Sequence, residues 1–223
     1  MILAVVGGKG GVGKTTVAYN LADELDAVVV DGDLGMADLP ERRGPDLHDV
    51  LAGRADAVEA VDETGAVDLL PCGRTLAGTR ACEVQRLPET LAAVATEYER
   101  VVVDCPGGLA SDSGSVLLAA DTCVVVTTPS DVALADALRA RALARELDAG
   151  LARVVVNRVA GGDEPPAGVR EAFGAPVVAV PESELVARAM AHAQPVAALA
   201  PGTVAAERFS DLAAGVQRST SSW

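Results

Sequence analysis

Residues 7–16 of the chain read Gly7-Gly8-Lys9-Gly10-Gly11-Val12-Gly13-Lys14-Thr15-Thr16. From Gly8 onward this stretch fits the pattern G-x-x-x-x-G-K-[ST], in which a glycine-rich loop surrounds phosphate with its backbone N–H groups. Residues 1–6, before the loop, are apolar, as expected of a buried strand. Residues 15–25, after it, repeat apolar side chains at helical spacing. Strand, loop and helix in this order predict a phosphate-binding loop at the positive end of a helix.

Lysine occurs only within this loop, at Lys9 and Lys14, and every other basic residue outside histidine is arginine. Because an ammonium is a compact point charge and a guanidinium a broad planar fork, the two are not equivalent in a narrow loop. We predict that Lys14 reaches the β- and γ-phosphates of ATP and that the Thr15 hydroxyl binds Mg²⁺. The residues of this segment expected to bind the nucleotide are Gly8, Gly10, Gly11, Val12, Gly13, Lys14, Thr15 and Thr16.

Apolar runs typical of strands recur along the chain, and helical segments separate most of them. The expected strands are residues 1–6, 27–30, 67–70, 101–103, 122–126, 153–156 and 176–180, and the main expected helices are 15–25, 87–98, 132–147, 183–192 and 205–212. This alternation predicts one α/β domain over residues 1–223, with a doubly wound, mostly parallel sheet flanked by helices. The carboxyl ends of such strands meet at one edge, where ligands bind. Residues 73–78 and 161–168 are predicted loops.

Three carboxylates follow apolar runs at this predicted edge: Asp31 and Asp33 after the second run and Asp104 after a later one. Asp104 precedes a proline–glycine turn, which suits a carboxylate that holds Mg²⁺, usually through water. Asp31 is expected to support either the Mg²⁺ shell or the loop that follows it. Read alone, the segment around Asp31 and Asp33 also fits a solvated acidic turn. The phosphate loop upstream favours the metal-binding interpretation.

The stretch from Lys9 to Thr16 resembles the deviant Walker A motif, K-G-G-x-G-K-T-[ST], of the MinD/ParA family of dimerising P-loop ATPases, and archaeal MinD-like members in particular. The resemblance implies that Lys9 crosses a dimer interface to the partner's nucleotide, whereas spacing alone places only a second cation near the phosphates. It also implies that Asp33 orients the attacking water. Lys9, Lys14 and Asp33 are thus the expected catalytic residues, and Thr15, Asp33 and Asp104 the expected metal ligands.

The resemblance extends over nearly the whole chain. Residues 31–39 resemble the family's D-x-D-x-G-x-x-N-L segment but depart from it at Asp38, where the family has asparagine. Two later strand ends resemble the family's adenine pocket, which implies that Asn157, Arg158, Pro181 and Glu182 contact the base. An asparagine at a strand end is, by itself, more often part of a turn or cap.

The charge balance limits the partners that the chain can have. The formal net charge is −14, lysine is scarce and only 2% of residues are aromatic, a composition that resembles proteins of extreme halophiles. A binding face for DNA requires clustered Lys and Arg, so we expect no direct DNA binding. No apolar run approaches the roughly 20 residues that span a bilayer, and no signal peptide is evident, so we expect a cytoplasmic protein.

Cysteine and histidine form no recognisable metal motif. Cys72, Cys82, Cys105 and Cys123 include no C-x-x-C pair, and we expect buried free thiols. His48 and His192 are isolated in the sequence. The apolar face formed by Ala205, Phe209, Leu212 and Val216 fits core packing better than a membrane anchor, because only Arg208 and Arg218 are basic there. Direct membrane contact is therefore not expected, although docking through a protein partner remains open.

Three functions are compatible with such an ATPase. The first is a MinD-like, ATP-dependent homodimer that positions the division site or polar structures and whose hydrolysis a protein partner stimulates. The second is a ParA-type partition ATPase, which the acidic composition disfavours. The third is an ATPase for metal-cluster or metalloenzyme maturation, which the missing C-x-x-C pair disfavours.

The role of Lys9 can be tested by substitution. If Lys9 crosses the interface, Lys9→Ala should bind ATP yet lose ATP-dependent dimers and most hydrolysis, and Lys9→Arg should not restore them, because a planar fork must enter a glycine-lined loop. Light scattering with ATP and Mg²⁺ measures the dimer, with Asp33→Ala as a slowly hydrolysing reference. Dimers of equal stability in both variants would show that Lys9 acts only on its own nucleotide.

Overall fold

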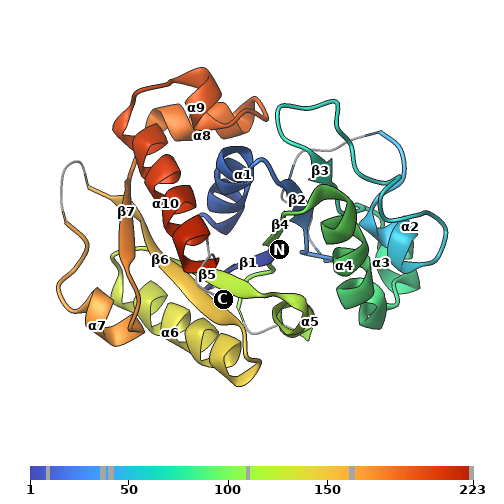
Figure 1. The fold of residues 1–223 in the computed structure, drawn as a ribbon, viewed down its shortest axis with the longest axis horizontal. Coiled ribbons are helices and arrows are strands. Elements are labelled where there is room, and N and C mark those ends of the chain that lie inside the picture. Colours follow the sequence, from blue (N-terminus) through green and yellow to red (C-terminus); the bar gives the residue numbers. More distant parts are fainter. Residues whose placement is uncertain (9–10, 36–38, 40–42, 109–110, 161–163, 221–223) are drawn as a thin grey trace.

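A computed structural model describes residues 1–8, 11–35, 39, 43–108, 111–160 and 164–220. Within these residues, seven parallel strands form one sheet in the order β3-β2-β4-β1-β5-β6-β7 (Figure 1). The strands are β1 (Ile2–Gly7), β2 (Val28–Asp31), β3 (Leu69–Leu70), β4 (Val101–Asp104), β5 (Thr122–Thr127), β6 (Gly150–Val159) and β7 (Val177–Pro181). The predicted α/β class is confirmed. The predictions on Lys9, Gly10 and Asp38 lie outside the described residues.

Helices connect these strands. They are α1 (Lys14–Leu25), α2 (Leu47–Leu51), α3 (Leu76–Ala81), α4 (Leu87–Tyr98), α5 (Ser111–Ala119), α6 (Asp131–Glu146), α7 (Val169–Phe173), α8 (Glu184–Ala191), α9 (Val196–Leu199) and α10 (Val204–Thr220), with a 3-10 turn, η1 (Val84–Arg86). Local signals set several starts. Pro88 occupies the first turn of α4, where its missing N–H costs nothing. The Ser130 hydroxyl caps α6 by accepting from the Ala133 N–H at 3.2 Å.

Two hydrophobic cores lie on opposite faces of the sheet. Because side chains alternate along a strand, Ile2 and Ala4 of β1 enter one core while Leu3 and Val5 enter the other. The first core is closed by helices that include α4 and α6, and the second by α1, α8, α9 and α10. Helices on both faces make the sheet doubly wound (Figure 1). Strand β1 lies in the middle, so the loop after it emerges at the centre of the ligand-binding edge.

The apolar face of α10 packs into the second core, as predicted. Ala205, Phe209, Leu212 and Val216 are all buried there. The helix is longer than expected and reaches Thr220. Among the described residues, no helix is both long enough and apolar enough to cross a bilayer. The face of α10 that the sequence marked as apolar is therefore used for packing within the chain.

Two predictions for the segment after the second strand need correction. The expected strand over residues 67–70 contains only two residues in the sheet, Leu69 and Leu70, which pair with Val29 and Val30 of β2. The predicted loop over residues 73–78 already contains the first turn of α3. The Thr75 hydroxyl accepts from the Gly78 N–H at 3.0 Å and starts this helix. Residues 164–168, the described part of the other predicted loop, lie outside helix and strand.

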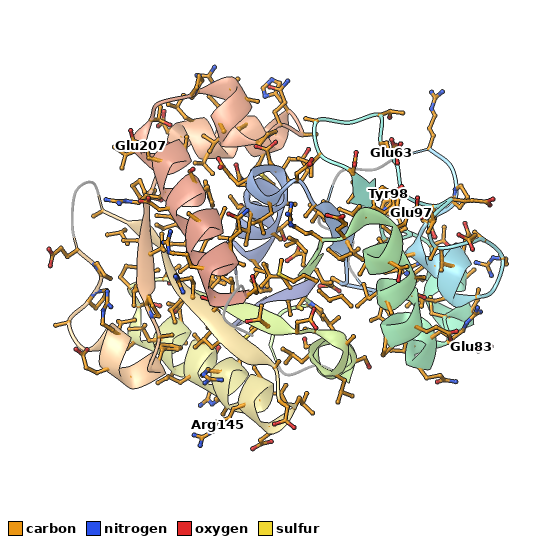
Figure 2. All side chains as sticks on the ribbon, viewed as in Figure 1. Glu63, Glu83, Glu97, Tyr98, Arg145 and Glu207 are labelled. Atoms are coloured by element: carbon orange, nitrogen blue, oxygen red, sulfur yellow. The ribbon has the colours of Figure 1, made fainter. Side chains whose placement is uncertain are left out.

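The cysteines are free thiols, and three of the four are buried, namely Cys72, Cys105 and Cys123. Cys82 is only partly buried. Several acidic side chains are exposed, among them the labelled Glu63, Glu83, Glu97 and Glu207 (Figure 2). One of them binds a neighbour: the Tyr98 hydroxyl donates to Glu63 Oε1 at 2.7 Å. Partial burial, followed by this bond and the charge of Glu63, raises the pKa of Tyr98 to about 12.

The second core offers a direct test of the packing. The Phe209 side chain is only 1% exposed, so Phe209→Ala should lower the free energy of unfolding by about 3–5 kcal/mol through lost burial and the cavity left behind. Val204→Ala is the matched control on the same helix, because Val204 is 57% exposed, and it should change stability by less than about 0.5 kcal/mol. Denaturant unfolding in one fixed salt concentration measures both. Equal effects would contradict the described packing of α10.

Candidate nucleotide-binding site

The glycine-rich loop joins the end of β1 to the start of α1. Gly7 ends the strand, and a Cβ atom there would lie 2.3 Å from the carbonyl oxygen of Val126 on β5. Gly11 and Gly13 have φ angles of 68° and 96°. Glycine adopts such positive φ angles readily, whereas a residue with a Cβ atom would be strained there. Gly13 is also the residue before the first turn of α1. The glycines therefore let the backbone pass close to the sheet and turn sharply into the helix.

The start of α1 has the electrostatics of an anion site. Its first turn, which begins at Lys14, contains no acidic residue, and the first N–H groups of any helix lack partners within the helix. The Lys14 ammonium lies 3.4 Å from the carbonyl oxygen of Gly8, so its side chain folds back over the loop. Residues 11–16, with Arg158 and Met190, line a cavity of about 330 Å³. A phosphate placed there would meet a helix dipole, N–H groups and an ammonium.

Asn157 braces the loop from the end of β6. Its Nδ2 donates to the carbonyl oxygen of Val12 at 2.8 Å, across 145 residues of sequence, and the residue is 6% exposed. A Cβ atom on Gly13 would lie 2.1 Å from this Nδ2, so glycine is needed at position 13 for the contact as well as for its φ angle. The sequence suggested an adenine contact, or a turn or cap, for Asn157. Its bond to the loop depends on β6 lying beside β5 and could not be read from a motif.

The four residues predicted to form an adenine pocket do lie together. Asn157, Arg158, Pro181 and Glu182 line a second cavity of about 330 Å³, between the ends of β6 and β7. Thr16 and Arg158 border both this cavity and the one around the loop. Arg158 has a φ angle of 56° and sits where the register of β6 against β7 shifts, so the strand bends at this residue. The two adjoining cavities suit the phosphates and the base of one nucleotide.

Two buried carboxylates lie side by side beyond the loop. Asp31 ends β2 and Asp104 ends β4, the two residues are register partners, and they are 0% and 2% exposed. The strand ends are also joined by a bond from the Gly32 N–H to the Asp104 carbonyl oxygen at 2.9 Å. The pairing brings both carboxyl groups to the strand ends beside the glycine loop, and carboxylate oxygens are ligands that Mg²⁺ prefers. Of the two residues, Asp104 is the one predicted to hold Mg²⁺.

Asp31 also holds the loop that follows it. Its Oδ1 accepts from the Asp33 N–H at 3.3 Å and its Oδ2 from the Leu39 N–H at 3.2 Å. Asp33 is half-buried, and its own Oδ1 accepts from the Gly35 N–H at 3.2 Å. Of the two roles left open for Asp31, the structure shows the support of this loop. We call residues 32–35, together with Leu39, the switch loop.

The oxygen donors fit Mg²⁺. A hydroxyl at Thr15 and carboxylates at Asp33 and Asp104 are hard ligands, the kind that Mg²⁺ prefers. Within the described part of the chain, no group of three or more His, Cys, Asp or Glu side chains is arranged to hold a metal ion by itself. Mg²⁺ is usually held by one or two carboxylates, and waters and substrate phosphates complete its shell. Burial and the adjacent Asp104 carboxylate raise the pKa of Cys105 well above its usual value, so this thiol stays neutral.

The chain belongs to the CobQ/CobB/MinD/ParA nucleotide binding domain family, whose model matches residues 3–196. An uncharacterised ATP-binding protein of Methanocaldococcus jannaschii is 33% identical over 227 residues, which cover 95% of this chain and 86% of that protein. The septum site-determining protein MinD of Bacillus subtilis is 32% identical over 173 residues, or 70% of this chain and 64% of MinD.

A solved structure extends the similarity to three dimensions. The septum site-determining protein MinD of Pyrococcus horikoshii, complexed with Mg-ADP, matches with a TM-score of 0.89 and 28% identity, over 98% of this chain and 96% of that one. The predicted family and P-loop ATPase fold are therefore confirmed. Proteins of the MinD/ParA type are ATPases, and the roles of individual residues in this chain stay predictions.

The brace of the glycine loop yields a prediction. Asn157→Asp replaces an N–H donor with a carboxylate that faces the Val12 carbonyl and adds negative charge beside the phosphate cavity. We expect the affinity for ATP to fall by about tenfold or more, since an unmet buried polar group costs about 1–3 kcal/mol. Isothermal titration calorimetry with ATP and Mg²⁺ measures the change. Glu184→Gln, at an exposed residue of α8 that lines neither cavity, is the control, and an Asn157→Asp affinity equal to wild type would refute the brace.

Proposed function

We propose that this protein is an ATP-hydrolysing switch of the MinD type, which forms a homodimer with ATP and releases it after hydrolysis. The observation that carries the proposal is that the glycine loop and three carboxylates lie at the same edge of the sheet: the loop after β1 lies between the ends of β4 and β5, and β2 pairs with β4. Asp31 and Asp104 end the two strands on one side of the loop, and Asp33 follows two residues after Asp31. The MinD of Pyrococcus horikoshii, complexed with Mg-ADP, supports ATP and Mg²⁺ as the ligands.

In this proposal each residue has one task in the attack of water on the γ-phosphate. Lys14 neutralises charge on the β- and γ-phosphate oxygens, and the first N–H groups of α1 orient the phosphates. Asp33 accepts a hydrogen bond from the attacking water and aligns it with the phosphorus. Thr15 and Asp104 would hold Mg²⁺, which when bound neutralises the phosphate charge that develops. Asp31 keeps Asp33 in place through its bonds to the switch loop.

The proposed output is assembly rather than a metabolic product. Two subunits would meet across their nucleotide edges, and loss of the γ-phosphate would release the switch loop and the dimer. Slow turnover that a protein partner stimulates fits such a cycle. The similarity to the MinD of Bacillus subtilis supports a role in spatial positioning of the division site or a polar structure.

Imaging tests the cellular role. A fluorescent fusion should form a mid-cell or polar pattern, and Lys14→Ala should spread evenly, because it lacks the charge that holds ATP. A pattern that follows the nucleoid in the unaltered protein would instead indicate a ParA-type partition function. We propose no direct contact with DNA, in view of the net charge of −14.

Asp33 provides the biochemical test of the switch. Asp33→Ala should keep its affinity for ATP but hydrolyse it at least about a hundredfold more slowly, since the attacking water loses its orienting carboxylate. Phosphate release measures turnover, and calorimetry measures binding. Asp211→Ala serves as a control, because Asp211 is a carboxylate on α10 paired with Arg208 and lines neither nucleotide cavity. Turnover within about twofold of wild type would remove Asp33 from the assigned role.

A further inference from the structure

The carbonyl group of Leu34, directly after Asp33, is contacted by two side chains from outside the loop. His48 Nε2 lies 3.0 Å from the Leu34 carbonyl oxygen. The Thr79 hydroxyl lies 3.2 Å from the same oxygen and 3.2 Å from the Thr75 carbonyl oxygen, so its one hydrogen is shared between these two acceptors. His48 belongs to α2 and Thr79 to α3, so two separate helices converge on one atom of the switch loop. Leu34 itself is 3% exposed, so its carbonyl oxygen depends mainly on protein donors for hydrogen bonds.

The His48 ring is fixed in one orientation. A carbonyl oxygen only accepts hydrogen bonds, so Nε2 must carry the hydrogen in this contact. The residue is 1% exposed, and Cys72 Sγ lies 3.3 Å from the same nitrogen. A Cβ atom on Gly73 or Gly78 would lie 2.4 Å or 2.6 Å from Nδ1, so two glycines leave room for the ring and little more. His48 is isolated in the sequence only; in the fold it reaches the candidate site.

A second contact ties the far end of the switch loop to the same region. Arg74, between β3 and α3, donates from Nη2 to the Leu39 carbonyl oxygen at 3.0 Å. On its other side the loop is held by Asp31, which accepts from the Asp33 and Leu39 N–H groups. The loop that carries Asp33 is therefore held on one side by the end of β2 and on the other by the α2–α3 region. A change in either support would move its carboxylate.

We propose that His48 and Thr79 are positioning residues for hydrolysis: by holding the Leu34 carbonyl they set where the Asp33 carboxylate stands relative to the attacking water. The proposal rests on the proposed ATPase function for its catalytic consequence, while the positioning itself is a property of the loop. It also means that α2 and α3, which contribute no residue to the nucleotide cavities described above, control turnover through one carbonyl group.

Paired substitutions separate the hydrogen bonds from the packing. Thr79→Val removes the hydroxyl while keeping the shape, and Thr79→Ser keeps the hydroxyl. His48→Gln can still donate from a similar position, whereas His48→Leu cannot. We expect turnover of bound ATP to fall about tenfold in Thr79→Val and further in His48→Leu, with ATP affinity unchanged, because a small misplacement of a catalytic group is costly. Thr79→Ser and His48→Gln should stay near wild type.

Hydrogen exchange measures how firmly the switch loop is held, independently of ATPase activity. The backbone amides of residues 33–35 should exchange about fivefold faster in Thr79→Val than in Thr79→Ser, with global unfolding midpoints matched between the two. Equal exchange in this pair would overturn the positioning role, and so would faster exchange with unchanged turnover. If the wild-type protein hydrolyses no ATP at all, the proposed function fails, and the exchange comparison still decides whether the two side chains hold the loop. If His48→Leu does not fold, the comparison of Thr79→Val with Thr79→Ser tests the positioning role.

Discussion

The parallel pairing of β1 with β4 on one side and β5 on the other is the constraint on which the site depends. It places the glycine loop at the centre of the sheet edge, with the ends of β2 and β4 to one side and of β5 and β6 to the other. Helix α1 then packs on one face and directs its first N–H groups along that edge. Carboxylates and amides that are far apart in the chain meet there because all seven strands run in the same direction.

The loop at this edge is held by residues that the phosphate motif does not contain. Asn157 binds the Val12 carbonyl from β6, and Gly13 is shaped to admit it. A loop with several glycines is intrinsically permissive, so an external hydrogen bond reduces the conformations it can adopt before a ligand binds. Preorganisation of this kind matters because N–H groups stabilise phosphate only when they already point at it. The brace thus connects the packing of β6 on β5 to the chemistry of the loop.

Two carboxylates are buried at the same edge of the sheet, and one of them supports the neighbouring loop. Asp31 and Asp104 are buried register partners, and burying a carboxylate costs free energy unless it is hydrogen-bonded or paired. The bonds from Asp31 to the switch loop offset part of that cost and use the carboxylate as a support. Asp33, one step outside the sheet, stays half-buried and able to reach a ligand. A buried carboxylate that holds the switch loop, next to a more accessible one, suits the proposed site, which would respond to the arrival and loss of Mg²⁺ and phosphate.

The sequence by itself determined the α/β class, the phosphate loop and the positions of the strand-end carboxylates, because apolar runs, helical spacing and glycine motifs are local patterns. Helix α4 occupies the predicted residues, and α1 begins one residue before them, for that reason. Only the tertiary structure decided the rest. It showed that β3 has two residues, that Thr75 starts a helix inside a predicted loop, and that His48 and Asn157 reach the loops of the site. Each of these depends on a contact between segments distant in the chain, or on a short element whose stability comes from its neighbours, and no local pattern encodes which distant partner will be present.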